Sequence, residues 1–241
     1  MAGHSKFANI KHKKEAQDSK RAKVFVKIIK EITVAVKKSG PDITTNSGLR
    51  LAIDKAKIAN MPKDNYEKAI KRASGQDNNN NYDEIRYEGY GPFGVAIMVD
   101  CLTDNKNRTS SNVRNYFKKS NGNLGTTNSV GYLFEKKGSI VFKTDLTNDK
   151  IMEKILELEI LDINLEDDTY KIIYCESEML NIIKEELQKI DQIELEEIKQ
   201  DMVPNSEIEL STNDDIIKLE KLINNLEDDD DVQQVYHNAK Y

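Results

Sequence analysis

Apolar and polar positions recur with helical spacing between residues 18 and 75. One helix is expected after the candidate N-caps Asp18 or Ser19, and two more are expected after Asn46 and after Pro62. The apolar stripe of the first helix comprises Phe25, Ile28, Ile29, Ile32 and Val36. Residues 1–17 are basic and only weakly periodic, which favours an extended arm. Three amphipathic helices with short connections predict a three-helix bundle.

Strand-like patterns follow a polar linker at residues 76–81. The near-continuous apolar run Gly94–Leu102 is typical of a buried central strand, and a helix over Thr109–Lys119 and a strand over 128–136 follow it. The segment 138–203 carries the order βαββαβ, which is that of a ferredoxin-like unit. A last strand, helix and strand are expected at 207–210, 214–226 and 232–236.

This order of elements predicts an α+β multidomain protein. We expect an N-terminal three-helix bundle plus two ferredoxin-like βαββαβ α+β domains, one inserted in the other, with helices on one face of each antiparallel sheet. The outer domain would combine 94–136 with the last strand, helix and strand. The expected boundaries are 1–75 for a basic helical domain, 82–137 plus 204–241 for an α+β domain, and 138–203 for an inserted acidic α+β domain.

Charge is segregated along the 241 residues, although the net charge is only −6. Residues 1–75 hold 18 Lys/Arg against 7 Asp/Glu, which is +11, whereas residues 76–241 hold 18 against 35, which is −17. A general bias toward Lys would raise Lys everywhere and would not separate the two signs. We therefore expect the first domain to offer a basic surface to a polyanion, while the acidic domains repel one.

The candidate nucleic-acid contacts are basic residues of the arm and first helix, together with a few arginines. Lysines three and four residues apart share a helix face, where like charges cost stability unless phosphates neutralise them. The chain has thirty Lys and only six Arg, so an Arg indicates a position where the forked guanidinium matters. The alternative for each residue is a solvated surface charge. The predicted set is Lys6, Lys11, Lys13, Lys14, Lys20, Arg21, Lys23, Lys27, Lys30, Arg50, Arg108 and Arg114.

Three other motifs have simpler structural explanations. Glu88–Gly94 is a Gly-rich turn that needs positive φ, and it lacks the Gly-Lys-Ser/Thr ending of a P-loop. Asp104 with Asn105 could hold a cation for nuclease chemistry, but one carboxylate is too few. The five acids at 227–231 lack the spacing of a calcium loop and suggest a solvated loop.

Pro62, between the second and third helices, allows a helix-turn-helix interpretation. The helix Asp64–Ala73 would then enter the major groove of DNA. Its basic side chains are Lys68, Lys71 and Arg72, with Lys63 just before it. Few Asn or Gln side chains are present to read bases, so binding to the phosphate backbone is favoured over specific DNA recognition.

Cysteine, histidine and apolar content narrow the class of protein. Cys101 and Cys175 lie far apart in apolar runs, which predicts buried thiols, and three histidines without a Cys pair do not suggest a zinc site. No apolar run approaches the length of a membrane span. We therefore expect a cytoplasmic protein that is not an enzyme and has no metal, cofactor, membrane partner or small-molecule substrate.

Short motifs along the whole chain resemble those of the YebC/PmpR family. They are Ala2–Lys11, Leu49–Ile53, Asn60–Asn65, Glu88–Gly94, Thr103–Thr109 and Val235–Asn238. Phe7 stands where the family usually has Trp, and Ser39, Phe93 and Asn121 stand where Gly is common. None of these differences touches the predicted basic set.

The resemblance implies a three-domain cytoplasmic protein with a helical N-terminal domain and two α+β domains. Most members of the family are described as DNA-binding transcriptional regulators. A mitochondrial relative activates translation of cytochrome c oxidase subunit I, and bacterial members are implicated as ribosome-associated factors that relieve stalling at proline-rich stretches. The implied partner is therefore DNA or ribosomal RNA, and a basic bundle without clear base readers suits either one.

Overall fold

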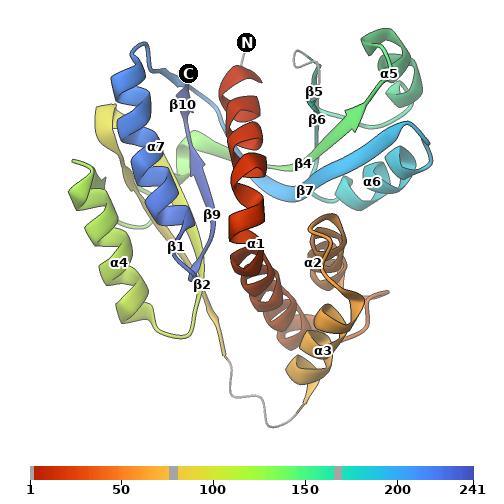
Figure 1. The fold of residues 1–241 in the computed structure, drawn as a ribbon, viewed down its shortest axis with the longest axis horizontal. Helices are drawn as coiled ribbons and strands as arrows, with labels where there is room; N and C mark the ends of the chain where they lie inside the picture. The colour runs from red at the N-terminus through yellow and green to blue at the C-terminus, as the bar shows by residue number, and fades with distance from the viewer. Residues whose placement is uncertain (1–2, 76–80, 166–169) are drawn as a thin grey trace.

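The protein is a mixed α+β chain built around two separate sheets. The computed structural model describes residues 3–75, 81–165 and 170–241, with side chains from residue 21 onward. Within these ranges it contains seven α-helices and two four-stranded antiparallel sheets (Figure 1). Helix α1 (Gly3–Ser39) stands between the two sheets in this view.

Three helices form the N-terminal bundle, as predicted. They are α1, α2 (Ser47–Ile58) and α3 (Lys63–Ser74). Ile28, Ile32 and Leu49 are buried in their shared core. The side chain of Asn46 accepts a hydrogen bond from the Leu49 amide, which satisfies one of the free donors at the start of α2.

The backbone of the expected N-terminal arm is helical. Helix α1 begins at Gly3, not at Asp18 or Ser19, so the prediction of an extended arm over residues 1–17 is wrong from Gly3 onward. Residues 4–39 contain no proline, and their lysines and alanines favour the helix. Weak apolar periodicity therefore does not interrupt the helix.

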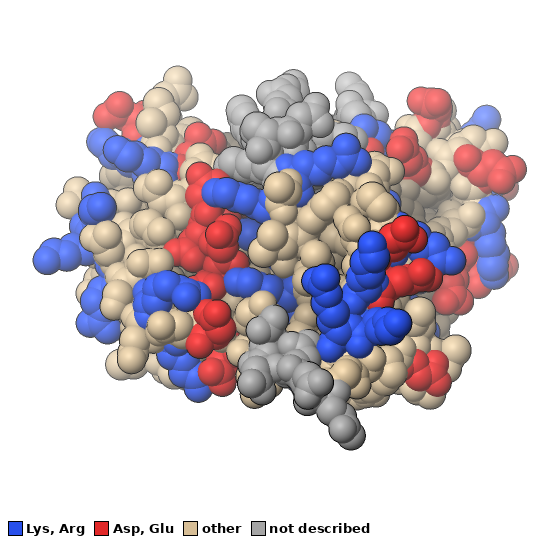
Figure 2. Space-filling model, turned by 60° about the horizontal axis from the view of Figure 1, so that its bottom comes forward, with Lys and Arg blue, Asp and Glu red and all other residues tan. Residues whose placement is uncertain are grey.

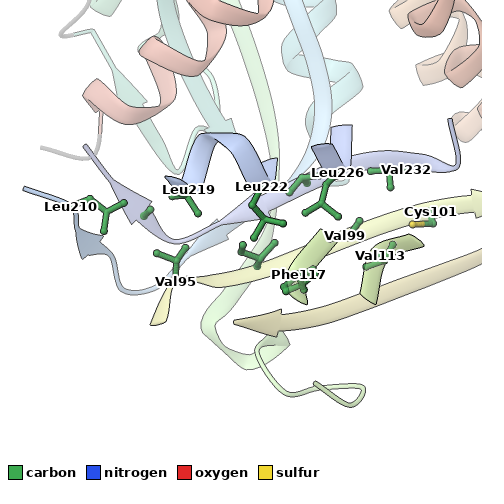
Figure 3. Packing of buried hydrophobic residues seen from close by; sticks show 13 residues of the cluster. Val95, Val99, Cys101, Val113, Phe117, Leu210, Leu219, Leu222, Leu226 and Val232 are labelled. Atoms are coloured by element: carbon green, nitrogen blue, oxygen red, sulfur yellow. The ribbon is translucent and has the colours of Figure 1, made fainter. Parts of the chain in front are cut away.

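The first sheet brings together strands from distant parts of the sequence. Its order is β3-β1-β2-β9. The strands are β1 (Asp83–Tyr90), β2 (Ala96–Thr103), β3 (Asn123–Leu124) and β9 (Val232–His237). Helices α4 (Lys106–Lys119) and α7 (Asn213–Glu227) cover one face, and Phe117 and Leu222 are fully buried between helices and sheet (Figure 3).

The second sheet is formed by one continuous segment. Its order is β5-β6-β4-β7, and all its pairs are antiparallel. The strands are β4 (Phe134–Thr144), β5 (Asp162–Asn164), β6 (Tyr170–Cys175) and β7 (Ile193–Pro204), and the helices are α5 (Asn148–Ile155) and α6 (Leu180–Gln188). The segment therefore follows the predicted order of strands and helices.

The part outside this segment differs from the predicted pair of half-units. The predicted half-units do not include strand β1, which pairs along its whole length with β2. The expected strand over 128–136 is a turn followed by a short 3-10 helix, Gly131–Leu133, and by the start of β4. The short strand β8 (Ile208–Glu209) pairs with β10 (Ala239–Lys240) in a two-stranded parallel sheet and does not join the main sheet.

The N-terminal bundle is fixed against the second sheet unit. Nζ of Lys184, on α6, lies 2.8 Å from Oδ2 of Asp54, on α2, and both side chains are largely buried. Leu51 and Ile58, also on α2, pack against the core of the second sheet unit. The bundle therefore has a defined orientation and is not a domain on a free tether.

Candidate nucleic-acid interface

Three predicted phosphate contacts on α1 bind the C-terminal end of α7 and the turn that follows it. Their ammonium groups donate to backbone carbonyls: Lys23 to Asp228 at 3.0 Å, Lys27 to Glu227 at 2.8 Å and Lys30 to Asp230 at 2.8 Å. The last carbonyls of a helix have no partner within the helix and carry partial negative charge. Lys23 and Lys27 satisfy this end from a neighbouring helix, and Lys30, three residues further along α1, binds the turn after it.

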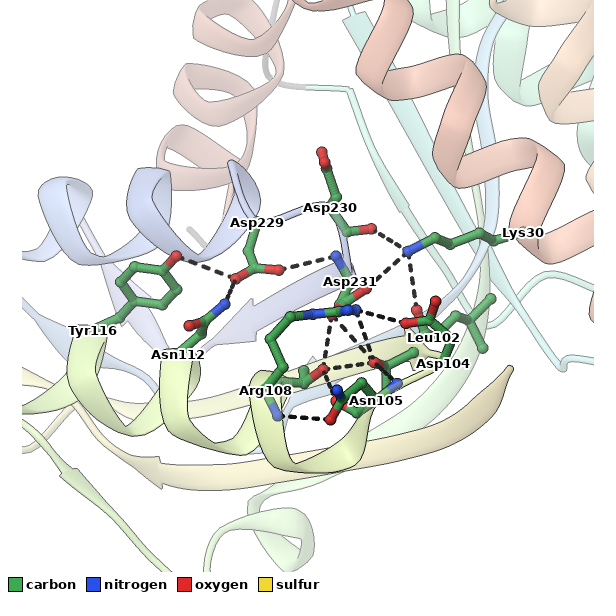
Figure 4. Close-up of polar contacts among 12 residues, drawn as sticks. Lys30, Leu102, Asp104, Asn105, Arg108, Asn112, Tyr116, Asp229, Asp230 and Asp231 are labelled. Atoms are coloured by element: carbon green, nitrogen blue, oxygen red, sulfur yellow. Dashed lines mark hydrogen bonds and ion pairs between the residues drawn. The ribbon is translucent and has the colours of Figure 1, made fainter. Parts of the chain in front are cut away.

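Asp231 is the centre of a buried polar network behind this contact (Figure 4). Its Oδ1 lies 3.0 Å from Nζ of Lys30, and its Oδ2 accepts hydrogen bonds from Arg108 and from the hydroxyls of Thr103 and Thr109. These partners come from α1, β2 and α4. One carboxylate therefore ties the N-terminal bundle to the first sheet unit.

The charge of Asp231 is stabilised by this network. Burial alone would raise the pKa of its carboxyl group, but the hydrogen bonds from Arg108, Lys30 and Thr109 outweigh burial and lower the pKa to about 2. The pKa of Arg108 is raised by its hydrogen bonds to Asp231 and Asp104. Both groups are therefore charged at neutral pH.

The acidic segment 227–231 is not the solvated loop that its composition suggests. Asp229 and Asp231 are buried, and the Asp229 carboxylate accepts hydrogen bonds from Asn112 and Tyr116 of α4 and from the Asp231 amide. A run of like charges predicts solvent exposure only when no cations lie nearby. Here, residues distant in sequence supply the cations and donors, which the run itself could not reveal.

The three lysines differ in how firmly they are held. Lys30 is buried and bonds to two residues of the acidic segment, whereas Lys23 is exposed and its ion pair with Asp228 is 3.7 Å long. An exposed pair of this kind contributes little to stability. A phosphate could replace the carboxylate at Lys23, but it could reach Lys30 only by breaking the network.

The predicted arginines lie on different parts of the surface. Arg21 donates to the carbonyl of Asn60, and Arg50 donates to the carbonyl of Thr44, so each guanidinium supports a turn of the bundle. Arg108 is committed to Asp231 and Asp104. Arg114 is exposed on α4. These four arginines therefore do not form one continuous surface.

The remaining predicted lysines lie along the first half of α1. They are Lys6, Lys11, Lys13, Lys14 and Lys20, and their backbone is helical, while their side chains fall outside the described residues. By sequence, residues 1–20 carry five lysines against Glu15 and Asp18. Phosphate binding by these five lysines stays a prediction.

Helix α3 carries a basic surface that the predicted site did not include. Lys68 and Lys71 are exposed, and neither makes an ion pair with any residue that the structure describes. Lys63 is also exposed and pairs with Glu67 only at 3.5 Å. The signal was present in the sequence, since these lysines lie at helical spacing opposite the buried Ala69 and Ala73.

Basic side chains gather in two regions of one face, with acidic side chains between them. Figure 2 shows Lys and Arg at the left, on the side of α4, and to the right of centre, on the side of α2 and α3. Between the two regions runs an acidic band, in which Asp and Glu predominate but some Lys and Arg side chains lie among them. A polyanion that contacts both regions must therefore pass over a repulsive surface.

A cleft of about 520 Å³ lies between α1, α2, β7 and Gln234 of β9. It is lined by both signs of charge. Lys55 pairs with Glu31 at 2.7 Å, and Lys199 pairs with Glu197 at 3.1 Å. Such a mixed wall is a poor match for a nucleic-acid backbone.

The other candidate chemistry has a structural explanation in the described residues. Oδ1 of Asp104 accepts a hydrogen bond from Arg108 at 2.8 Å. No group of three or more His, Cys, Asp or Glu residues within 3–75, 81–165 and 170–241 could hold a metal ion.

Cys101 and Cys175 are buried free thiols, as predicted, and burial raises the pKa of Cys101 to about 12. No helix among the described residues is long and apolar enough to cross a membrane.

Two family models together match nearly the whole chain. The model described as "TACO1/YebC protein N-terminal domain" matches residues 5–76, and "TACO1/YebC second and third domain" matches residues 82–239. The chain belongs to the TACO1/YebC family. The family assignment confirms the resemblance that the sequence motifs suggested.

Similar TACO1/YebC proteins align over the full length. The chain is 52% identical to a "probable transcriptional regulatory protein" of Nitrosospira multiformis, with 99% of each chain covered. It is 47% identical to the "probable transcriptional regulatory protein YrbC" of Bacillus subtilis, with both chains fully covered. A crystal structure of a conserved hypothetical protein from Aquifex aeolicus is 41% identical and superposes with a TM-score of 0.84, covering 92% of this chain and 91% of that one.

Proposed function

We propose that the protein is a non-enzymatic regulator of gene expression that binds the phosphate backbone of nucleic acid through its basic N-terminal helical domain. The observation that carries this proposal is the exposed basic surface of α3, where Lys68 and Lys71 have no carboxylate partner in the described structure. The charge of +11 on residues 1–75 agrees with it. Lys23 stays in the proposed set, whereas Lys30 and Arg108 act inside the protein.

Regulation at the level of DNA is supported by the names of the relatives, which call them probable transcriptional regulatory proteins. Phosphate contacts alone carry no sequence information. A DNA-binding regulator would therefore need base contacts in addition to the basic surface of α3.

The alternative is a ribosome-associated translation factor that binds ribosomal RNA and relieves stalled translation, for example at proline-rich stretches. The amino-acid sequence of α3 favours this alternative in one respect. Asn65 is the only Asn or Gln between Lys63 and Ser74, so the helix has few side chains that could read base edges. Backbone recognition without base readout suits structured RNA.

We also propose the three predicted domains as the units of this function. The boundaries are 1–75, 82–137 plus 204–241, and 138–203. The order β5-β6-β4-β7 in the second sheet supports a ferredoxin-like inserted domain. The acidic inserted domain would keep the rest of the molecule away from the polyanion.

The proposal is tested by charge reversal on α3. The variant Lys68→Glu/Lys71→Glu should weaken binding of the full chain to RNA or DNA by about tenfold or more, because two phosphate contacts become repulsive. The matched control is Lys150→Glu/Lys154→Glu on α5, which makes the same change of charge at exposed positions of the acidic unit. Equal affinities for the two variants would contradict the assignment of the site.

Co-sedimentation with ribosomes, set against selection from randomised DNA, distinguishes DNA from ribosomal RNA. An enriched DNA motif without ribosome association supports transcriptional regulation and contradicts the translation alternative. Ribosome association that is lost in the α3 variant, without an enriched DNA motif, supports the translation factor.

A further inference from the structure

Helix α4 has an exposed face that no intramolecular contact explains. The helix spans Lys106–Lys119 and contains five basic residues and no acidic one. Its buried side, which includes Val113 and Phe117, packs into the core of the first sheet unit. Its opposite side is a single stripe at helical spacing: Asn107, Ser111, Arg114, Asn115 and Lys118.

The side chains of this stripe have no partners within the described part of the chain. Their neighbours on the same helix behave differently, since Arg108 binds Asp231 and Lys106 lies 3.1 Å from Asp83. The protein therefore neutralises the cations at the start of α4 and leaves Arg114 and Lys118 open to solvent. Hydroxyl, amide and cationic groups in one row are the donors that contact phosphates and sugar hydroxyls.

We propose that the α4 stripe is a second nucleic-acid surface and that the ligand is a folded RNA. This inference rests on the proposed nucleic-acid binding and goes beyond it, because the site lies outside the N-terminal domain. Helix α4 lies on one side of the acidic band and α3 lies on the other (Figures 1 and 2). A straight backbone that reached both surfaces would cross that band.

The geometry of the ligand follows from this separation. The persistence length of duplex DNA is about 150 base pairs. A short duplex is therefore stiff, and bending it around the acidic band costs free energy. A stem-loop or other folded RNA presents two backbone segments in different directions. It can contact α4 with one segment and α3 with the other, while bases or water face the acidic band.

The experiment measures binding of the full chain to a labelled RNA stem-loop and to a DNA duplex of the same stem length by fluorescence anisotropy. The variants are Arg114→Glu/Lys118→Glu on α4 and Lys68→Glu/Lys71→Glu on α3. The control is Lys150→Glu/Lys154→Glu. Thermal unfolding checks that each variant is folded, since surface changes of this kind usually alter stability by less than about 0.5 kcal/mol.

The inference predicts that the α4 variant binds the stem-loop about tenfold or more weakly than the control, and that the slope of log affinity against log salt falls by about two. Binding of the duplex should change much less. If the α3 variant loses stem-loop affinity while the α4 variant binds like the control, the α4 site is wrong and the proposed function stands. If the α4 variant loses affinity for duplex and stem-loop equally, the assignment to folded RNA is wrong. If the wild-type chain binds neither probe, both proposals fail.

Discussion

The ammonium group of Lys30 lies 3.0 Å from Oδ1 of Asp231, although 201 residues separate the two in the sequence. The contact joins α1 of the N-terminal bundle to the segment between α7 and β9. Arg108 holds the other carboxylate oxygen, so Asp231 is bound by cations from two different helices. The orientation of the bundle on the first sheet unit thus depends on a buried ionic network.

Acid should weaken this network through Asp231. The pKa of its carboxyl group is about 2 in the folded protein and near 3.8 when unfolded, so the ionised form contributes about 2 kcal/mol of stability at neutral pH. A lowered folded-state pKa gives stability that is present above pH 4 and is lost as the pH falls toward 2. Urea unfolding of the wild type and of Asp231→Asn at pH 7, 4 and 2.5 measures the contribution of Asp231 to the free energy of unfolding. The difference in unfolding free energy should shrink across that range, and a constant difference would contradict the network.

Lys30 and Lys23, which bind the turn after α7 and the end of α7, should differ in their effect on stability. Lys30→Met removes a buried donor from Asp231 and from the Asp230 carbonyl, so it should lower the free energy of unfolding by about 1–3 kcal/mol. The matched change Lys23→Met removes an exposed pair and should cost less than about 0.5 kcal/mol. Denaturant unfolding at neutral pH measures both. Similar losses for the two variants would show that burial does not set the strength of these contacts.

Gly89 should resist substitution because of packing and not because of its backbone angles. A Cβ atom at Gly89 would meet the carbonyl oxygen of Asn123 on β3, and the Phe117 ring lies 3.1 Å from the same point. Gly89→Ala must therefore push β3 away from β1, at a cost of about 1–3 kcal/mol. At Gly48, near the start of α2, a Cβ meets only ordinary contacts, so Gly48→Ala should be neutral or slightly stabilising. Thermal melting compares the two, and equal stability would refute the steric explanation.

The first half of α1 should supply nucleic-acid affinity without affecting the fold. The triple change Lys11→Glu/Lys13→Glu/Lys14→Glu reverses three charges in the segment that is most basic by sequence. We expect nucleic-acid or ribosome binding to be lost while the melting temperature stays close to that of the wild type. Filter binding and circular dichroism measure the two properties. Unchanged binding would exclude this half of α1 from the interface.

The sequence predicts local structure well where a periodic stripe and a cap occur together. Asn46 and the apolar positions of α2 place that helix correctly, and the order of elements in 138–203 agrees with the structure. The pattern is less reliable where a strand is short or carries many charged residues. Strand β1 alternates Glu84, Arg86 and Glu88 with Ile85 and Tyr87, and its charged positions weaken the strand pattern beside the Gly-rich turn.

The candidate site shows what a sequence cannot contain. Charge segregation identifies the basic domain, but it does not say which lysines face solvent. Lys27 and Lys71 have the same chemistry, yet one caps α7 and the other is exposed on α3. The acids that neutralise the second half of α1 lie at the other end of the chain, so only the folded structure separates structural cations from available ones.

The dependence of nucleic-acid affinity on salt tests the central claim most directly. The full chain is titrated into a labelled RNA stem-loop at several salt concentrations between 50 and 200 mM, and the slope of log affinity against log salt is measured. Contact with about six or more phosphates predicts a slope of about −5 or steeper and a loss of affinity of about a thousandfold across a range of this size. A flat response would contradict phosphate recognition and would indicate that the basic domain serves a protein partner.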